Sequence, residues 1–207
     1  MPKVSEAHIA ARRQQILDAA RACFARQGFH QTSIQDICKE AGLSPGAVYR
    51  YFPSKDHIIA ATCSGCQEGI MEMIQVAKSQ GLAPLETVGI IIDHGLDMMS
   101  SDAFLEFGMM NIQSWSEAMR SDEVREALLT AIFNTLGQAI SDLIEQAQQD
   151  GECHDELSAK VVACAIMGTF HGLMLHKSLD STLDIAACGK VMRAMFQGIY
   201  QKAADVA

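Results

Sequence analysis

The stretch TSIQDICKEAGLSPGAVYRYFPSKD, residues 32–56, restricts the possible folds more than any other part of the chain. It contains two short helical patterns separated by a tetrapeptide with Gly42. The first pattern begins with Thr32 followed three residues later by Gln35, the spacing of a capping box. Gly42 is expected to end this helix because glycine readily adopts a positive φ. The second helix therefore starts within a few residues of the first, after a tight turn.

The second helical pattern has an equally clear start. Ser44 followed by Pro45 matches an N-cap with proline at the first helical position, where the missing N–H costs nothing. Two short helices joined by a tight turn containing glycine are typical of a DNA-reading helix-turn-helix. The second helix also carries Tyr49, Arg50 and Tyr51, an aromatic and basic cluster that a core hairpin does not need.

A longer amphipathic helix is predicted upstream, over about residues 9–27. Gly28 is expected to end it in a left-handed conformation. Apolar positions of the three helices then form a small common core of Ile16, Ala19, Ala20, Cys23, Phe24, Ile34, Ile37, Leu43, Val48 and Phe52. Such a core is marginal alone, so we expect this unit to pack against the rest of the chain.

Residues 10–60 resemble the N-terminal domain of TetR-family transcriptional regulators. The resemblance rests on Arg13, Ile16-Leu17, Ala19-Ala20, Phe24, Gly28, Thr32, Ile34, Ile37, Ala41-Gly42-Leu43-Ser44, Gly46, Val48-Tyr49, Tyr51-Phe52 and Ser54-Lys55. Cys38 and His57 depart from the family pattern. The resemblance implies a DNA-binding domain at 1–54 and an effector-binding and dimerisation domain at 55–207. It also implies a repressor that binds a palindromic operator as a homodimer and releases it on binding a small apolar or amphipathic effector.

Roles for the DNA-binding residues follow from their chemistry. Hydroxyl and ammonium groups of Thr32, Ser33, Tyr49, Tyr51 and Lys55 are expected to hold phosphates, which fix register. The Arg50 guanidinium suits guanine O6 and N7, and Gln35 suits a base edge. Pro45, Gly46 and Ala47 would make close apolar contacts. The complete candidate set is Thr32, Ser33, Gln35, Ser44, Pro45, Gly46, Ala47, Tyr49, Arg50, Tyr51 and Lys55.

The net charge of −9 is distributed unevenly. Residues 1–60 hold eight basic and five acidic side chains, whereas the rest holds eight basic and 20 acidic ones. This asymmetry suits a modestly basic DNA-binding end on an acidic body. The N-terminus lacks the apolar region of a signal peptide, and the uncharged run 161–175 is short for a membrane span. A cytoplasmic protein is therefore expected.

The remaining chain shows helical periodicity without strand-like alternation. Helices are predicted over about residues 55–79, 85–99, 103–119, 121–149, 156–177 and 183–202. With the first three, they make an all-α fold of about nine helices.

Small residues on the last two predicted helices suggest a face for close helix packing. The dimer-interface candidates are Cys164, Gly168, Gly172, Gly189, Met192 and Phe196. The alternative is that both stripes pack only within one subunit. The dimer is favoured because a helix-turn-helix reader normally needs two half-sites about 34 Å apart.

Methionine is concentrated in the body, with eleven of twelve beyond residue 70. Flexible, polarizable methionine suits a surface that adapts to varied apolar ligands. It also serves as core filler, which is the simpler explanation for any single position. For the cluster around the only tryptophan, a ligand cavity is predicted, lined by Phe104, Phe107, Met110, Asn111, Trp115, Phe170, His171 and Met174.

Cys63 and Cys66 form a C-x-x-C pattern inside a predicted helix. A redox pair would sit at a helix N-terminus, and a zinc site normally needs a second ligand pair, which the sequence lacks. Structural cysteines are the first interpretation, with thiol or metal sensing as alternatives. No acid–base pair, activated nucleophile or phosphate loop indicates an enzyme, and no cofactor or metal is predicted.

Overall fold

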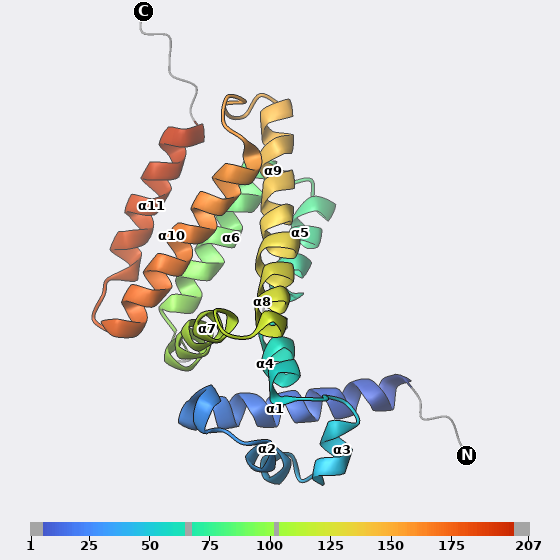
Figure 1. Cartoon of the computed structure of the whole chain (residues 1–207). Helices are drawn as coiled ribbons and strands as arrows, with labels where there is room; N and C mark the ends of the chain where they lie inside the picture. The colour runs from blue at the N-terminus through green and yellow to red at the C-terminus, as the bar shows by residue number, and fades with distance from the viewer. Residues whose placement is uncertain (1–5, 65–67, 102–103, 201–207) are drawn as a thin grey trace, which may run out of the picture. The chain divides into compact units, whose positions relative to one another are not determined.

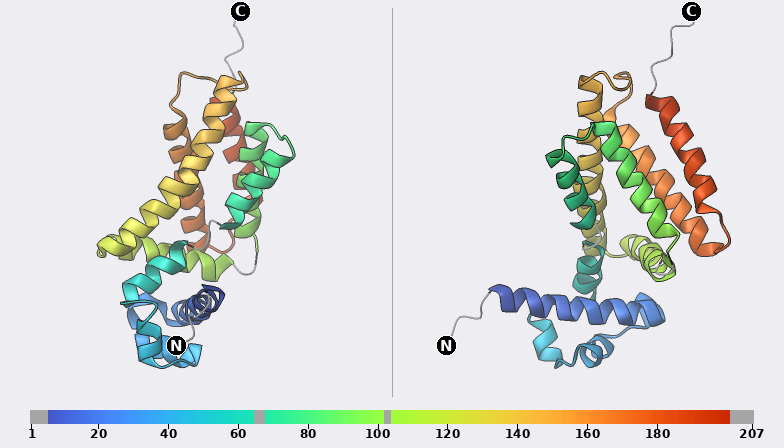
Figure 2. Two further views of the ribbon diagram at one scale, coloured as in Figure 1. Left: turned by 90° about the vertical axis from the view of Figure 1, so that its right-hand side faces the viewer. Right: turned by 180° about the vertical axis from the view of Figure 1, so that it is seen from behind.

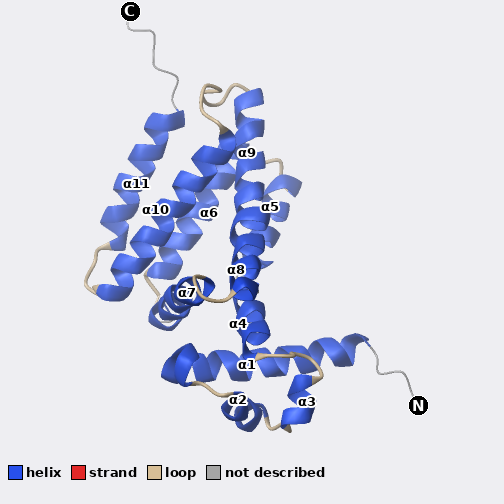
Figure 3. Ribbon diagram, viewed as in Figure 1, coloured by secondary structure: helices blue, strands red, loops and turns tan. Residues whose placement is uncertain are grey.

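The computed structural model describes residues 6–64, 68–101 and 104–200, with side chains left undescribed at 63, 64, 68, 105–107 and 197–200. Every regular element in these ranges is a helix (Figure 3), which confirms the predicted all-α class. The chain divides into two compact units. The first contains residues 1–66 and 109–129, and the second contains 67–108 and 130–207.

The first unit is built on α1 (Glu6–Gln31), which packs against α2 (Ile34–Ala41) and α4 (Lys55–Ser64). The short α3 (Pro45–Tyr49) follows α2 (Figure 1). Helix α1 is kinked at Gly28, whose φ of 76° and ψ of 169° are not helical. Beyond the kink, Phe29 turns back to meet Phe24 edge-on, with ring centroids 4.6 Å apart. The predicted stop at Gly28 is thereby confirmed as a break in the helical backbone.

A later segment completes this unit. Residues 109–129 contribute most of α7 (Phe104–Ala118) and all of α8 (Asp122–Leu128), and α8 packs against α4. The first compact unit therefore extends past residue 54, and the functional division expected at that residue stays a prediction. Helix α4 is held between α1 and α8, so it belongs to the first unit rather than to the body.

The second unit surrounds α6 (Pro84–Met99). Four helices pack against α6 and can be followed in the two views of Figure 2: α5 (Glu68–Ser79), α9 (Gln138–Gln149), α10 (Ala159–Leu179) and α11 (Ile185–Tyr200). Glycines permit two of these approaches. A Cβ at Gly95 would lie 2.2 Å from Phe170 Cε2, and one at Gly189 would lie 2.7 Å from Leu96 Cδ1.

The long helix predicted for 121–149 is present, but its middle is a π-helix, η2 (Leu129–Gly137). A Thr135 Oγ1 to Thr130 O hydrogen bond of 2.9 Å spans five residues, the π-helical repeat. The predicted helix 55–79 is described as α4 and α5, and residues 65–67 between them lie outside the described ranges.

Within the described residues, two stretches are long and apolar enough to cross a membrane by length and composition alone, Asp122–Gln149 and Ala159–Leu179. Core helices of globular proteins pass the same test. Helices α9 and α10 pack against each other and against α6, so we interpret them as core elements.

Candidate nucleic-acid interface

Helix α2 begins at Ser33, which is its N-cap. Ser33 Oγ accepts from the Asp36 N–H at 3.2 Å, and Asp36 Oδ2 accepts from the Ser33 N–H at 2.8 Å. The predicted capping box of Thr32 and Gln35 is therefore wrong by one residue. Asp36 reaches back to the cap from the third helical position. The same hydrogen bonds from Ser33 lower the pKa of the Asp36 carboxyl.

The turn and the start of α3 follow the sequence prediction. Gly42 ends α2 with a φ of 64°, and its N–H donates to the Lys39 carbonyl at 3.2 Å. Ser44 is the N-cap of α3, because its Oγ accepts from the Ala47 N–H at 3.3 Å. Pro45 follows in the first turn. The two helices are therefore connected by only three residues that belong to neither.

One side of the α2–α3 pair is open to solvent. Apolar residues of the other side, Ile37, Val48 and Phe52, are buried. Tyr49 is 50% exposed although it is aromatic, and Arg50 is exposed beside it. The other exposed candidates are Ser33, Gln35, Ser44, Pro45 and Gly46, with Ala47 and Tyr51 half-buried. This surface offers a guanidinium, an amide, hydroxyls and a bare backbone, the groups that contact phosphates and base edges.

Two of the predicted phosphate contacts are instead engaged within the protein. The Thr32 side chain is buried, and its Oγ1 donates to the Gly28 carbonyl at 2.8 Å. Lys55 Nζ donates to the carbonyls of Phe29 at 2.8 Å and of Thr32 at 3.2 Å. The expectation that Thr32 holds a phosphate is corrected by its burial. Lys55 ties α4 to the α1–α2 turn, and a phosphate role for it stays a prediction.

Arg13 has a role that the sequence analysis did not assign. Its guanidinium carbon lies 4.4 Å from the centroid of the Phe52 ring, and its Nη1 donates to the Tyr51 carbonyl at 3.0 Å. Both contacts fix the end of the segment that carries α3, so the exposed Arg13 of α1 positions the Tyr51 backbone. Local sequence patterns do not predict this contact, because Arg13 and Tyr51 are 38 residues apart.

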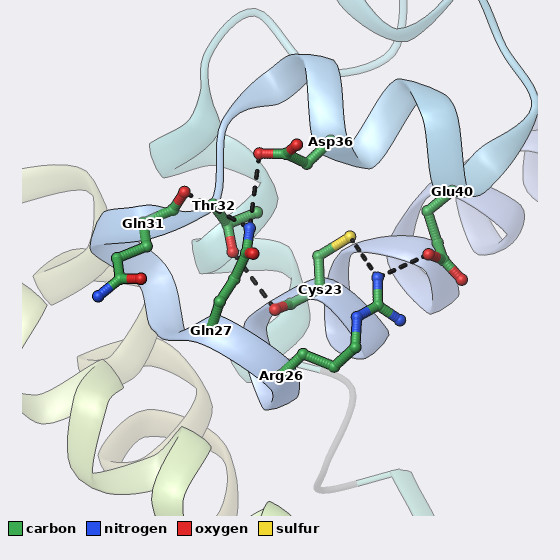
Figure 4. Close-up of polar contacts among 7 residues, drawn as sticks. All are labelled: Cys23, Arg26, Gln27, Gln31, Thr32, Asp36 and Glu40. Atoms are coloured by element: carbon green, nitrogen blue, oxygen red, sulfur yellow. Dashed lines mark hydrogen bonds and ion pairs between the residues drawn. The ribbon is translucent and has the colours of Figure 1, made fainter.

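A polar network fastens α2 to α1 (Figure 4). Arg26 Nη2 donates to Glu40 Oε2 at 2.6 Å and to Cys23 Sγ at 3.4 Å. Gln27 Nε2 reaches Asp36 Oδ2 at 3.5 Å. The hydrogen bond and charge of Glu40 raise the pKa of Arg26, while burial raises the pKa of the Cys23 thiol. Both ends of α2 are therefore held by side chains of α1.

The structure divides the predicted dimer residues into two groups. On α10, Cys164 and Gly168 are exposed, and a Cβ at Gly168 or Gly172 would meet nothing within 4 Å. On α11, the predicted residues Gly189, Met192 and Phe196 are buried within the chain. The α11 part of the prediction is therefore wrong, since this face packs inside the second unit. The exposed apolar residues of α11 are Val191 and Met195.

The predicted ligand-binding residues are divided between the two units. Met110, Asn111 and Trp115 belong to the first unit, whereas Phe104, Phe170, His171 and Met174 belong to the second, and the side chain of Phe107 is not described. Within the second unit, Phe104 and Met174 are buried. Burial lowers the pKa of His171, which lies edge-on to Phe170 with ring centroids 6.2 Å apart.

The C-x-x-C pattern falls outside what the structure describes, because Cys66 and the side chain of Cys63 are not described. Among the described residues, no three or more His, Cys, Asp or Glu side chains are grouped so that they could hold a metal ion. The thiol-sensing and metal-sensing interpretations therefore stay untested.

Comparison with known proteins agrees with this geometry. Residues 16–62 match the model of bacterial regulatory proteins of the tetR family. The transcriptional repressor Rv1474c of Mycobacterium tuberculosis is 29% identical over 84% of this chain and 86% of its own. The structure of Salmonella enterica GusR is 26% identical, covers 96% of this chain and 98% of its own, and has a TM-score of 0.75. The Stenotrophomonas maltophilia SmeT–triclosan complex shares the fold, with a TM-score of 0.74, 22% identity and coverage of 94% and 93%.

Helices α2 and α3 are both capped, are joined by a tight turn and rest on a small apolar core. Their open side carries exposed aromatic and basic side chains. This combination defines a helix-turn-helix DNA-binding protein. The family match over residues 16–62 and the similarity of relatives over nearly the whole chain narrow the class of DNA-binding protein further. Residues 16–62 match the model of the TetR family, and over most of its length the chain is similar to known transcriptional regulators.

Proposed function

We propose that this protein is a ligand-responsive repressor that binds a palindromic operator as a homodimer and releases it on binding a small apolar or amphipathic effector. The observation that carries the proposal is the exposed α2–α3 surface, in which Arg50 and Tyr49 stand open to solvent above a buried apolar side. The relative Rv1474c is described as a repressor, which supports repression over activation. A cytoplasmic location follows from the proposed contact with DNA.

Selection from a random pool of DNA duplexes tests the DNA-binding part. The purified protein is expected to enrich a palindrome whose half-sites are about 34 Å apart, or one helical turn. Binding should weaken steeply with salt, because each neutralised phosphate releases counterions. Equal affinity for every duplex would refute the operator-binding role.

The exposed apolar side chains of α10 and α11 support a homodimer. Leu179 is 80% exposed and Val191 is 61% exposed, and Val161, Leu175 and Met195 are exposed as well. The open sides of Gly168 and Gly172 allow a second helix to approach closely. Apolar side chains in this number on two adjacent helices are typical of a surface that a partner covers.

A charge placed on this face tests the dimer. Val191→Glu should convert the protein to a monomer in light scattering and weaken operator binding, because a carboxylate would be buried without a partner. Val76→Glu, at a 47% exposed valine of α5, is the matched control and should remain dimeric. A Val191→Glu variant that stays dimeric would place the interface elsewhere.

The effector part rests on the apolar interior of the second unit and on analogy. SmeT, which shares the fold, has been captured in a complex with triclosan. A thermal-shift screen against diverse small molecules should yield compounds that raise the melting temperature and also release the selected duplex. Compounds that stabilise without releasing DNA would contradict an inducer role, since an inducer must prefer the DNA-incompetent state.

A further inference from the structure

The turn between α1 and α2 determines where the DNA-reading helices begin. Gly28 breaks α1, Phe29 enters the core, and Ser33 starts α2 four residues later. Thr32 Oγ1 closes the turn by donating to the Gly28 carbonyl. A displacement of this short connection would therefore move the N-terminus of α2 and its exposed Ser33.

Two helices distant in sequence hydrogen-bond to the two backbone polar groups of Phe29. Its N–H donates to Gln113 Oε1 on α7 at 2.9 Å. Its carbonyl accepts from Lys55 Nζ on α4 at 2.8 Å. Phe29 is buried, so leaving either group without its partner would be costly.

The absence of a side chain at Gly28 permits the contact from α7. A Cβ on Gly28 would lie 3.0 Å from Gln113 Oε1, tighter than nine in ten real Cβ contacts, so the Gln113 amide would have to shift. Glycine here therefore serves both the positive φ and the approach of the Gln113 amide. The hydrogen bond from Phe29 to Gln113 therefore depends on both the missing side chain at Gly28 and the length of the Gln113 side chain.

The contact continues along α7 and α8. Glu117, one helical turn after Gln113, lies 3.5 Å from His30, and Arg120 approaches the same imidazole at 3.4 Å. Farther on, Ser121 Oγ donates to Asp56 at 3.0 Å, and Glu123 contacts His57 at 2.7 Å. The His contacts are exposed and worth little individually. The Gln113 bond differs because its partner is a backbone group of a buried residue.

We propose that Gln113 is a positioning residue for DNA binding: its amide oxygen holds the Phe29 backbone and so links α7 to the start of α2. This inference rests on the proposed DNA-binding function and names a route by which that function can be regulated. Helix shifts in switching proteins are about 1–2 Å. A shift of that size along α7 would stretch a 2.9 Å hydrogen bond beyond hydrogen-bonding distance. The position of α7 would then affect the position of the N-terminus of α2.

Paired variants separate this role from a general effect on folding. Gln113→Met keeps the length of the side chain but removes the acceptor, whereas Gln113→Glu keeps an acceptor oxygen. Gln113→Ala removes the acceptor by another route, should methionine prevent folding. Gln75→Met, at an exposed glutamine of α5, is the matched control. The only tryptophan, Trp115, lies two residues from Gln113 on α7 and reports on this helix by fluorescence.

The probe is a duplex selected by the wild-type protein from a random pool. Saturating duplex is expected to change Trp115 fluorescence in the wild type, in Gln113→Glu and in Gln75→Met. Gln113→Met and Gln113→Ala should lose this change and bind the duplex about tenfold more weakly, the equivalent of one lost hydrogen bond. Hydrogen exchange of the Phe29 amide should accelerate by a similar factor in both.

The outcomes distinguish two failures. If the wild type enriches no duplex, the proposed function fails and the positioning role fails with it. If the duplex binds but Gln113→Met keeps the wild-type fluorescence change and Phe29 exchange, only the positioning role is refuted. Loss of the change in Gln75→Met would also refute it, because the effect would then not depend on the Phe29 contact.

Discussion

Replacing Lys55 by methionine distinguishes an internal role of this side chain from a contact with DNA. Methionine keeps most of the aliphatic stem and removes the ammonium, whose two hydrogen bonds reach the carbonyls of Phe29 and Thr32. A hydrogen bond to a charged group contributes roughly 1.5–3 kcal/mol. Because the Lys55 side chain is only half-buried, we expect a combined loss of about 2 kcal/mol.

The assay is thermal unfolding followed by circular dichroism. A chain of this size loses roughly 2–4 °C in melting temperature per kcal/mol, so Lys55→Met should melt about 4–8 °C lower. Lys78→Met, at an exposed lysine of α5, should melt within about 2 °C of the wild type, as surface substitutions usually change stability little. Both variants should keep the helical spectrum at low temperature.

The salt dependence of duplex binding provides the decisive comparison. If the ammonium remains on its two carbonyls in the complex, the slope of log K against log salt is the same in Lys55→Met and the wild type. If the ammonium instead neutralises a phosphate, the slope falls by about 0.9. An unchanged melting temperature together with a smaller slope would refute the internal role and restore the phosphate contact that the sequence suggests.

Three further predictions concern the reading surface, its helix cap and the second unit. Arg50→Ala should weaken duplex binding by about 1–3 kcal/mol and relax base preference at one position per half-site, measured by repeated selection; an unchanged selected sequence would show that Arg50 does not read a base. Because Ser33 lowers the pKa of Asp36 in the folded protein, its carboxylate stabilises the fold above the unfolded pKa, and this contribution is lost as pH falls through the folded value. Asp36→Asn should therefore unfold more readily in urea than the wild type at pH 7, with the difference shrinking toward pH 3, and a constant difference would contradict the cap. Gly95→Ala should destabilise the protein by about 1–3 kcal/mol in urea unfolding, because its Cβ would overlap the Phe170 ring, whereas Gly89→Ala, where a Cβ meets nothing, should not; equal effects would contradict the close packing of α6 on α10.

The internal role of Lys55 shows why a motif can be recognised while its members are assigned wrongly. Thr32, Ser33 and Lys55 all carry groups that bind phosphate, and sequence chemistry cannot distinguish them. Only Ser33 is exposed. The other two are engaged by carbonyls of a turn whose shape depends on Gly28 and on the burial of Phe29. Side-chain chemistry shows that Thr32 and Lys55 could bind phosphate. Their hydrogen bonds to nearby backbone carbonyls show how these side chains are used in the folded protein.

The stripes on the last two helices show the same limit for packing. Spacing of three and four residues placed Gly189, Met192 and Phe196 on one face of α11, and that face exists. The periodicity does not say whether its partner is another helix of the same chain or a second copy. Leu96 of α6 takes the space above Gly189, so this face is internal.

The sequence alone determined most of the local structure of this protein: the cap of α3, the tight turn, the all-helical pattern, and the exposed tyrosine and arginine at the end of α3. These features depend on residues within about four positions of one another, because capping, φ preference and helical periodicity are short-range effects. The tertiary structure decided which groups remain available for a partner. It brought Arg13 to Phe52, Lys55 to the α1–α2 turn and Gln113 to Phe29, contacts across 26 to 84 residues that only packing of a common core produces.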